Sequence, residues 1–489
     1  MISGVMSLHN DIFNKTVFDF CELFMAGSCY PVQGNDTEAC FEVYCNNAGE
    51  NGGFFIFAGL NRLIENISRL NFSDGDICYF RELGLDPAFL DYLKNFRLNL
   101  DIWSVPEGTP VFPGEPVIKI WGPAAQAQLA ETLILLPISY QTGVATKANR
   151  LVRAAGGRQI IETGAKRAPG GEAALCGARA AFIGGASATT CVNAAREYNI
   201  PYTAGMNSGF VQLFDNEREA FAAFARKNPE NCVLILDTYD TLKSGLENAI
   251  DVFNAELIPR GFRPKGVRID SGDLAYLSKK IRRRLNDAGF PDCAVIASNA
   301  LDEYIIKDML LHGARVDSFM AGRKLVSPSQ NCNFSYKITA VKKDDAVTPK
   351  IKLSGNVAKN TAPCAKLLWR LFDRETGKAI ADLLTLEDET VDESVPYQLF
   401  DPDFTWKRKT AENFIARQLL KPVFKNGELA AAPPGLADIR AYCLQQVDSL
   451  WEEVLRFEYP HDYYVDYSQR LWDERTKLIH HLQCALDDG

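Results

Sequence analysis

The spacing of apolar and polar residues changes along the chain and divides it into three segments. Over residues 1–125, helix-like stretches such as FDFCELFMAGSCY alternate with strand-like ones, and DIWSVPEGTPVFPGEPVIKIWGP indicates strands joined by Pro and Gly turns. This mixture predicts an N-terminal α+β domain. Residues 346–489 hold a Lys-rich segment, a turn-rich stretch and amphipathic helices near 435–456 and 466–485. They predict a C-terminal extension that packs on the other two segments.

Between these segments, over residues 126–345, short apolar strands are followed by amphipathic helices. The expected strands are RQIIET (158–163), NIPYTA (199–204), NCVLILDT (231–238), PKGVRID (264–270), CAVIASN (293–299) and RVDSFMA (315–321). Helical stretches such as GDLAYLSKKIRRRLNDAG come between them. Strands and helices in alternation are typical of parallel βαβ units, and their number favours a barrel over a small open sheet. The expected fold class is α/β, with an irregular parallel α/β barrel at the centre.

Polar residues follow the expected barrel strands directly, where the active sites of such barrels lie. They are Lys166, Arg167, Asp237, Asp240, Arg268, Asp270, Asp273, Asn299, Gly322, Arg323 and Lys324. Arginine, lysine and the backbone amides of glycine turns suit phosphate or pyrophosphate, and carboxylates among them suit sugar hydroxyls. The sequence therefore predicts a site for a phosphorylated sugar at the mouth of the barrel.

Several of these residues have a structural alternative. Asp270 ends a strand and can face the mouth, whereas Asp273 falls in the first helical turn and could serve only the helix dipole. Asp237 is equally compatible with helix capping and with ligand binding. Arg167 could be an ion-pair partner, although the glycine-rich loop after it favours a ligand role.

Composition narrows the classes of function. A chain of 489 residues suggests roughly two or three packed units. A net charge of −9 argues against broad nucleic-acid binding, and the basic run KKIRRR (279–284) is typical of a solvated helix face. The 13 cysteines include no C-x-x-C pair, which favours reduced thiols and no metal site. No long apolar run and no secretory leader is visible, so we expect a cytoplasmic protein.

Segments along nearly the whole chain resemble the nicotinate phosphoribosyltransferases, in the order of that family. They are DFCELFMA, TGAKRAPGGEAALCGARAAFIGGASATTCV, NIPYTAGMNSGF, LDTYDTLKSG, GVRIDSGDLAYLSK, ASNALDE, AGRKLV and KLSGNVAKNTAP. The resemblance implies a dimer with sites near the subunit interface. It also implies transfer of ribose 5-phosphate from phosphoribosyl pyrophosphate to the ring nitrogen of nicotinate, with Mg²⁺ on the pyrophosphate. Family members couple this transfer to ATP hydrolysis through a phosphorylated histidine.

By resemblance, Asp270 binds the ribose hydroxyls, Arg268 contacts the carboxylate of the base or a nearby phosphate, and Arg167 helps to hold the anions. The departures from the family pattern fall on the same loops. The family's histidine falls on Ser208, its substrate-contacting threonine on Gly205, its aromatic cover of the base on Cys21, and its G-T turn on Gly322 and Arg323. The loss of histidine makes an ATP-coupled cycle doubtful, because a serine phosphoester is not a labile N–P bond.

Three hypotheses stay open on these residues. The first is a nicotinate phosphoribosyltransferase whose site has diverged, and it accounts for the most residues. The second is a phosphoribosyltransferase for another heteroaromatic base. The third is a non-catalytic relative that serves as a binding or regulatory subunit and could pair with an active partner. The expected assembly is a homodimer.

Overall fold

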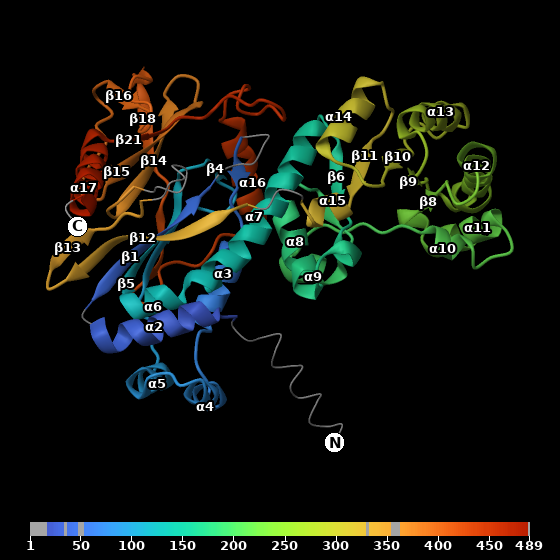
Figure 1. Cartoon of the computed structure of the whole chain (residues 1–489). Helices are drawn as coiled ribbons and strands as arrows, with labels where there is room; N and C mark the ends of the chain where they lie inside the picture. Colours follow the sequence, from blue (N-terminus) through green and yellow to red (C-terminus); the bar gives the residue numbers. More distant parts are fainter. Residues whose placement is uncertain (1–16, 34–36, 47–52, 329–331, 354–361, 488–489) are drawn as a thin grey trace. The chain divides into compact units, whose positions relative to one another are not determined.

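The computed structural model describes residues 17–33, 37–46, 53–328, 332–353 and 362–487. Two compact units make up the chain: unit 1 combines residues 1–142 with 331–489, and unit 2 comprises residues 143–330 (Figure 1). The units cut the chain differently from the three predicted segments, whose boundaries at 125 and 345 stay a prediction. All six tryptophans belong to unit 1, at positions 103, 121, 369, 406, 451 and 472.

A sheet of six parallel strands forms the centre of the described part of unit 2. The strands are β6 (Gln159–Glu162), β7 (Ala188–Thr189), β8 (Val233–Ile235), β9 (Gly266–Ile269), β10 (Ala294–Ala297) and β11 (Ser318–Ala321). Their order, β7-β6-β11-β10-β9-β8, is cyclic in sequence and opens between β7 and β8. A parallel sheet with this order is barrel-like with one open seam. The expected α/β class with an irregular parallel barrel is confirmed.

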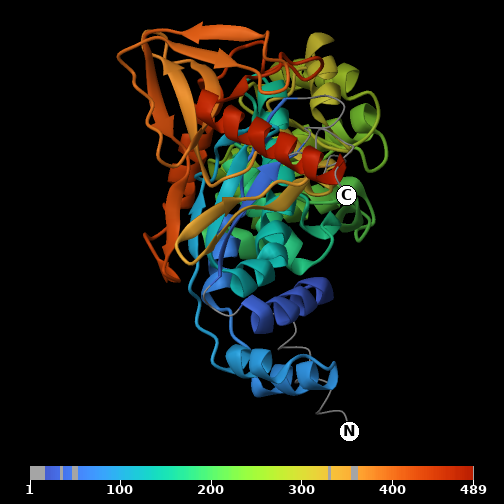
Figure 2. The same cartoon turned by 60° about the vertical axis from the view of Figure 1, so that its left-hand side comes forward.

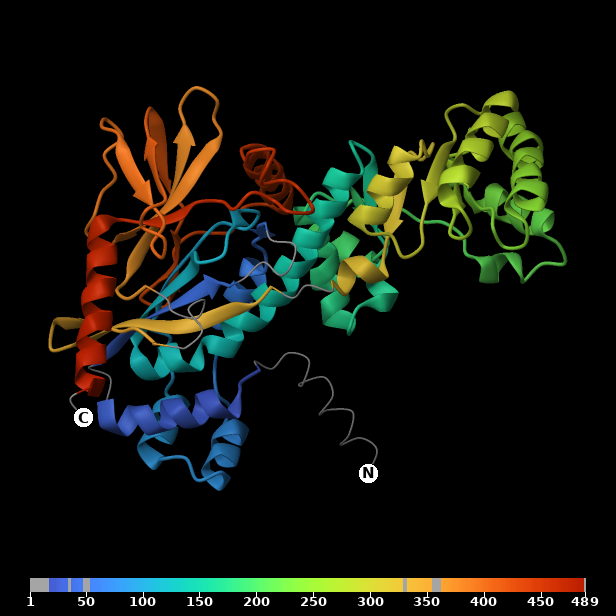
Figure 3. The ribbon, with the colours of Figure 1, turned by 45° about the horizontal axis from the view of Figure 1, so that its top comes forward.

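Helices alternate with these strands. They are the second half of α7 (Glu131–Ala154), then α8 (Gly171–Ile183), α9 (Val192–Tyr198), α10 (Ser208–Val211), α11 (Glu217–Lys227), α12 (Leu246–Val252), α13 (Leu274–Asp287), α14 (Glu303–Leu311) and α15 (Arg323–Val326). Side-chain caps begin several of them: Asp273 accepts a hydrogen bond from the Tyr276 N–H, and Asp302 accepts one from the Ile305 N–H. Helix α13 packs on β10, and Figure 3 shows α12 and α13 within the group of yellow-green helices. The caps fix where each helix leaves the mouth of the sheet.

Unit 1 is built on sheets to which both ends of the chain contribute. The larger has the order β13-β12-β1-β5-β3-β19-β20, and a second has the order β18-β14-β15-β21. The strands are β1 (Glu38–Cys45), β3 (Asp101–Ser104), β5 (Pro116–Pro123), β12 (Phe334–Lys343), β13 (Ala346–Pro349), β14 (Lys366–Asp373), β15 (Ala379–Leu386), β18 (Phe414–Gln418), β19 (Lys421–Lys425), β20 (Glu428–Leu429) and β21 (Val465–Tyr467). Short pairs β2 (Phe55–Ile56) with β4 (Pro110–Val111) and β16 (Tyr397–Phe400) with β17 (Arg408–Ala411) complete them.

Helices of unit 1 pack around these sheets. They are α2 (Phe20–Gln33), α3 (Leu60–Ser68), α4 (Asp74–Glu82), α5 (Pro87–Lys94), α6 (Ala124–Leu129), the first half of α7, α16 (Leu436–Asp448) and α17 (Gln469–Asp487). Figure 2 shows α17 alongside the C-terminal strands, and it packs on β15. The expected helices near 435–456 and 466–485 thus begin close to the predicted positions.

Two groups of strands differ from the sequence expectations. The segment NIPYTA, which we predicted to be a barrel strand, forms only an isolated parallel bridge, between Tyr202 and Thr189. The strand that pairs with β6 at this place is β7. The strands β14 to β20 lie in the segment for which we expected turns and helices. In β15, seven of eight residues are buried, so the strand has an almost continuous apolar pattern without the alternation that marks a half-buried strand.

A buried ionic cluster links the sheet that contains β14 and β15 to β4 and to the loop before β5. Both nitrogens of the Arg370 guanidinium that face Asp382 donate to its carboxylate, at 2.8 and 2.6 Å. Arg370 also donates to the Pro110 carbonyl, and the Tyr463 hydroxyl donates to Asp382. Glu115 lies 3.9 Å from the guanidinium, and burial, followed by the charge of Asp382, raises the pKa of its carboxyl. Arg370, Asp382 and Glu115 are all 0% exposed.

Asp466 in β21 is a second buried carboxyl of unit 1. It is 4% exposed, and burial, followed by the charge of Asp401, raises its pKa from 3.8 to about 7, against the opposing effect of Lys409. A raised native pKa means that the folded chain holds this proton more tightly than the unfolded chain. The resulting stability is complete below pH 3.8 and is lost as the pH rises through about 7.

We therefore expect Asp466→Asn to flatten the pH dependence of stability. As the pH rises from acidic to mildly alkaline, the free energy of unfolding of unit 1 should fall in the wild type. This fall should be about 1–3 kcal/mol larger than the fall measured for the variant. Urea unfolding followed by tryptophan fluorescence measures unit 1 selectively. Equal pH profiles for the two proteins would contradict a raised pKa for Asp466.

Candidate functional site

A pocket of about 250 Å³ lies at the carboxyl ends of the unit 2 strands. Its lining comes from positions within β9 and β11 and from the residues after β6, β9, β10 and β11: Thr163, Lys166, Arg167, Arg268, Asp270, Ser298, Asn299, Ala300, Met320, Gly322 and Arg323. Seven of the residues predicted from the sequence meet here. Parallel strands bring their carboxyl ends to one edge of the sheet, which explains why residues up to 157 positions apart share a pocket.

The pocket is strongly cationic. Lys166, Arg167, Arg268 and Arg323 line it, and Asp270 is the one carboxylate among the described lining residues. The Nε atom of Arg268 is buried and has no hydrogen-bond partner in the described part of the chain. A buried guanidinium N–H without a partner favours an anion as its acceptor, because leaving it unpaired is costly. The pocket is therefore suited to phosphate and carboxylate groups.

Two neighbouring strand ends hold Asp270 in place. The Asp237 carboxylate, after β8, accepts hydrogen bonds from the Asp270 N–H at 2.8 Å and the Ser271 hydroxyl at 2.6 Å. Ser298, after β10, donates its hydroxyl to the Asp270 carboxylate at 2.5 Å. Ser298 is buried, so this donor has few other orientations. These contacts fix the backbone and one carboxylate oxygen of Asp270, and the second oxygen is available to a ligand.

The loop after β10 has a strained backbone. Asn299 has φ of 110°, a conformation that side chains other than glycine rarely adopt. Its side-chain oxygen accepts a hydrogen bond from the Ala300 N–H at 2.7 Å, which supports the turn locally. Strain of this kind tends to gather at functional sites and costs about 1–3 kcal/mol. It supports the placement of Asn299 in a binding loop.

A buried carboxyl lies directly behind the pocket wall. Glu162 ends β6, is 1% exposed, and accepts hydrogen bonds from the Gly164 N–H and the Thr189 hydroxyl. Burial raises the pKa of Glu162, although both hydrogen bonds oppose the shift. Glu162 thereby ties the loop that carries Lys166 and Arg167 to the end of β7. The sequence analysis did not identify it.

Four lining residues were also missed: Thr163, Ser298, Ala300 and Met320. Ser298 could have been found, because it lies one residue after a predicted strand, beside Asn299. Met320 lies within β11, and an apolar residue inside a strand gives no sequence signal for a pocket.

Four residues predicted at the strand ends of unit 2 have other partners. Asp240 accepts hydrogen bonds from the N–H groups of Leu242 and Lys243 and so caps the helix that follows it. Asp237 positions Asp270 as described, and Asp273 caps α13. Lys324 forms an ion pair with Asp302, where the Ile305 N–H and Lys324 together lower the pKa of Asp302 against the opposing effect of burial. Their roles as ligand contacts stay predictions.

Comparison with known proteins identifies the relatives of this chain. Profiles of the N-terminal and C-terminal domains of nicotinate phosphoribosyltransferase match residues 17–139 and 365–475. A nicotinate phosphoribosyltransferase of Bacillus subtilis (strain 168) is 35% identical over 99% of this chain and 97% of its own length. The chain belongs to the nicotinate phosphoribosyltransferase family. A second relative of that name, from Mycobacterium tuberculosis, is 34% identical over 94% of this chain and 93% of its own length.

Solved structures show the same fold. The crystal structure of human nicotinic acid phosphoribosyltransferase matches with a TM-score of 0.83 and 25% identity, over 95% of this chain and 100% of that one. The structure of a nicotinate-nucleotide pyrophosphorylase from Pyrococcus furiosus matches with a TM-score of 0.69 and 20% identity, over 88% of this chain and 95% of that one. The second likeness concerns the fold alone.

Three of the residues at which this chain departs from the family pattern, Gly205, Ser208 and Cys21, do not line the pocket, whereas Gly322 and Arg323 do. Ser208 is the first residue of α10, after Asn207, which caps that helix. Gly205 is exposed, and a Cβ atom there would lie 3.9 Å from Val233 of β8, beside the open seam of the sheet. Cys21 belongs to α2 of unit 1, where it is exposed and its N–H donates to Asp19. Contact of these three residues with a ligand stays a prediction.

Two searches of the described residues found nothing. No group of three or more His, Cys, Asp or Glu side chains is arranged to hold a metal ion. No helix in the described ranges is both long and apolar enough to cross a membrane.

Proposed function

We propose that this chain transfers the 5-phosphoribosyl group of phosphoribosyl pyrophosphate to the ring nitrogen of nicotinate or a related pyridine-type base, without a phosphohistidine step. The observation that carries the proposal is the pocket of unit 2, in which cations and one oriented carboxylate face the same space. Family membership supports the reaction, and the curated relatives bear its name.

Each group in the pocket has a chemical task in this transfer. The nitrogen lone pair of the base forms a bond to C1 of the ribose, and the C1–O bond to pyrophosphate breaks with its electrons leaving on pyrophosphate. Positive charge develops at the ribose ring, where the fixed Asp270 carboxylate stabilises it and accepts hydrogen bonds from the hydroxyls. Lys166, Arg167 and Arg323 bind the phosphate groups, and Arg268 binds the carboxylate of the base or an adjacent phosphate.

Mg²⁺ would accompany pyrophosphate in this pocket. Carboxylate and phosphate oxygens are its preferred ligands, and Asp270 is the lining carboxylate that could reach it. The ion would neutralise part of the charge of the leaving group. Because the described residues offer no cluster of ligands, we expect Mg²⁺ to bind with pyrophosphate and not to the free protein.

The absence of ATP coupling rests on Ser208. Unit 2 contains a single histidine, His312, which follows the C-terminal end of α14 and is exposed. That end of the helix precedes β11, so His312 belongs to the edge of the sheet opposite the pocket. No histidine of unit 2 is therefore placed to replace the family's phosphorylated one.

Pyrophosphate release tests this proposal. Purified protein with phosphoribosyl pyrophosphate, Mg²⁺ and nicotinate should release pyrophosphate at a rate that ATP leaves unchanged within about twofold, because no N–P intermediate forms. Nicotinamide and quinolinate serve as competing bases. Release that requires ATP would contradict the uncoupled cycle. Silence with every base, from a folded protein, would contradict the transferase proposal and favour a binding subunit.

Ser208→His combined with Gly205→Thr restores the two family residues and is the matched variant. ATP stimulation of this variant, without stimulation of the wild type, would identify Ser208 as the reason for uncoupling. Equal responses of both proteins would assign the uncoupling to another part of the site.

The remaining expectations concern assembly and location. We propose a homodimer, as implied by the family, and sedimentation velocity measures it directly. The cytoplasmic location stays a prediction.

A further inference from the structure

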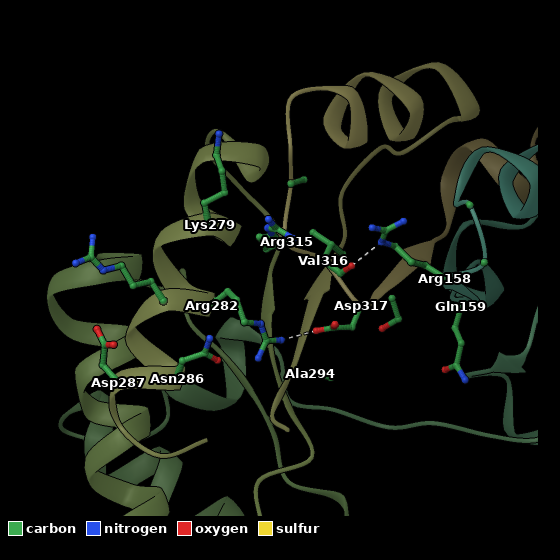
Figure 4. A pocket seen from close by; sticks show the side chains of 15 residues that line it. Arg158, Gln159, Lys279, Arg282, Asn286, Asp287, Ala294, Arg315, Val316 and Asp317 are labelled. Carbon is green, nitrogen blue, oxygen red and sulfur yellow. Dashed lines mark hydrogen bonds and ion pairs between the residues drawn. The ribbon is translucent and has the colours of Figure 1, made fainter. Parts of the chain in front are cut away.

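A second pocket lies at the opposite edge of the unit 2 sheet from the candidate site. Its volume is about 1210 Å³, and it includes the first residues of β6, β10 and β11, namely Gln159, Ala294 and Ser318. The C-terminal half of α13 and the loop before β11 complete it (Figure 4). Parallel strands place their amino ends on the edge away from the catalytic edge. The two pockets therefore have no lining residue in common.

This pocket is basic although the protein carries a net charge of −9. Five cations line it, against the two carboxylates of Asp287 and Asp317; the cations are Arg158, Lys279, Arg282, Arg283 and Arg315. Three of them belong to the run KKIRRR. A concentration of one charge in a concave surface raises the local potential and attracts the opposite charge.

Several of these cations are held in place by neutral groups. Arg158 donates to the carbonyls of Val316 at 2.9 Å and Ala155 at 3.2 Å, and Lys279 donates to the His312 carbonyl at 3.2 Å. A carbonyl orients a cation without cancelling its charge. Only Arg282 has a carboxylate partner among the described residues, Asp317, at 2.5 Å. Figure 4 shows the Arg158 and Arg282 contacts as dashed lines.

Among the donors of the pocket that have no partner in the described part of the chain, Arg315 and Gly157 lie outside α13. The exposed guanidinium of Arg315 makes no hydrogen bond or ion pair there, and only its backbone N–H is used, by Ser278. The N–H of Gly157 is equally unpaired, and φ of 83° with open space at its Cβ position exposes the backbone. A glycine turn beside arginine side chains is a common anion-binding arrangement.

A purely structural explanation accounts for only part of this cluster. Cations near the C-terminal end of α13 favour its helix dipole, and Arg282 pairs with Asp317 while Arg284 pairs with Glu247. The same explanation does not apply to Arg315 or Gly157, which belong to other elements.

We propose that this pocket binds an oligoanion of the inorganic polyphosphate class, at a site separate from the transferase pocket. The volume exceeds the needs of a single phosphate group, and the cations come from three different segments, so an extended chain of phosphates can contact several of them. No aromatic side chain is among the lining residues, so the pocket offers no stacking surface for a nucleoside base. The proposal does not depend on the transferase activity.

Calorimetric titration with inorganic tripolyphosphate on the full chain tests the proposal. The double variant Lys279→Gln, Arg315→Gln should bind tripolyphosphate at this pocket at least about tenfold more weakly than the wild type, because two charge-assisted contacts are lost. Lys280→Gln removes the same charge from the next residue of α13, outside the pocket, and should bind as the wild type. Arg167→Gln reports on the other pocket. Loss in Arg167→Gln alone would overturn the proposal, as would ATP binding at least about tenfold tighter than tripolyphosphate at this site.

Lysine acetylation followed by mass spectrometry tests where the anion binds in the wild-type protein, without any substitution. Tripolyphosphate should protect Lys279 at least about threefold and leave the neighbouring Lys280 unprotected, since only Lys279 lines the pocket. Equal rates with and without the anion at Lys279 would overturn the site. The assay does not depend on turnover, so an inactive transferase pocket does not affect it.

Discussion

Asp270→Asn should lower kcat/KM for phosphoribosyl transfer by about 10²–10³ and act mainly on kcat. The substitution preserves the shape of the side chain and keeps an oxygen to accept the Ser298 hydroxyl. It removes the negative charge that, in the proposed reaction, faces the ribose in the transition state. The charge matters most when C1 becomes positive, so ground-state affinity for phosphoribosyl pyrophosphate should change less than the rate. Steady-state kinetics with a coupled pyrophosphate assay separates the two effects.

Asp308→Asn is the matched control for this prediction. Asp308 lies on α14 of the same unit, with a side chain that is 70% exposed, and its carboxylate lies 3.4 Å from the ring of His312. The control loses the same charge from the same unit, and its kcat/KM should stay within about twofold of the wild type. A ten-fold or smaller loss in Asp270→Asn, or an equal loss in both variants, would contradict the role of Asp270 at the reacting centre.

The residues of the candidate site were predictable where a strand ends in a polar run. Arg268 and Asp270 follow an apolar strand in one short segment, and a parallel sheet determines the edge at which they appear. Lys166 and Arg167 were found in the same way after β6. The sequence thus indicates which residues lie together at the mouth of the sheet, but it does not give the distances between them.

The residues that position the pocket residues were harder to predict from the sequence than the residues that line the pocket. Glu162 is the last residue of β6, and at such a position the sequence alone does not distinguish a buried carboxyl from an exposed one. Its partner Thr189 belongs to β7, a strand of two residues that is too short to give a periodic signal. Asp237 was identified as a candidate, but its contact with the Asp270 N–H depends on the neighbouring positions of β8 and β9.

In unit 1 the sequence failed for a different reason. Strands from beyond the barrel strands pair with strands from the first part of the chain: β12, from the end of the predicted barrel segment, pairs with β1, and β19, from the C-terminal segment, pairs with β3. Such pairing depends on residues hundreds of positions apart, and a local pattern does not contain it. Arg370 illustrates the consequence, since a charged residue in an apolar strand indicates exposure unless its partner is known.

Arg370→Met should destabilise unit 1 by about 3–5 kcal/mol, the largest effect expected for a single substitution in this chain. Methionine is shorter than arginine but, like it, unbranched at Cβ and Cγ, and it fits an apolar environment. Its cost arises from Asp382 and Glu115, which lose the buried cation that compensates them. Because all six tryptophans belong to unit 1, urea unfolding followed by fluorescence reports on this unit, and circular dichroism reports on both.

A control variant and a rescue variant show whether the loss of stability comes from the broken buried ion pair or from the removal of an arginine as such. Arg374→Met breaks the exposed pair with Glu393 and should cost less than about 1 kcal/mol. Adding Asp382→Asn and Glu115→Gln to Arg370→Met removes the uncompensated charges, and it should recover at least about half of the lost stability. A loss below about 1 kcal/mol in Arg370→Met would mean that the buried carboxyls take up protons in place of the guanidinium. In that case the variant should lose more stability than the wild type as the pH rises, since the two carboxyls would have to lose their protons inside the folded unit.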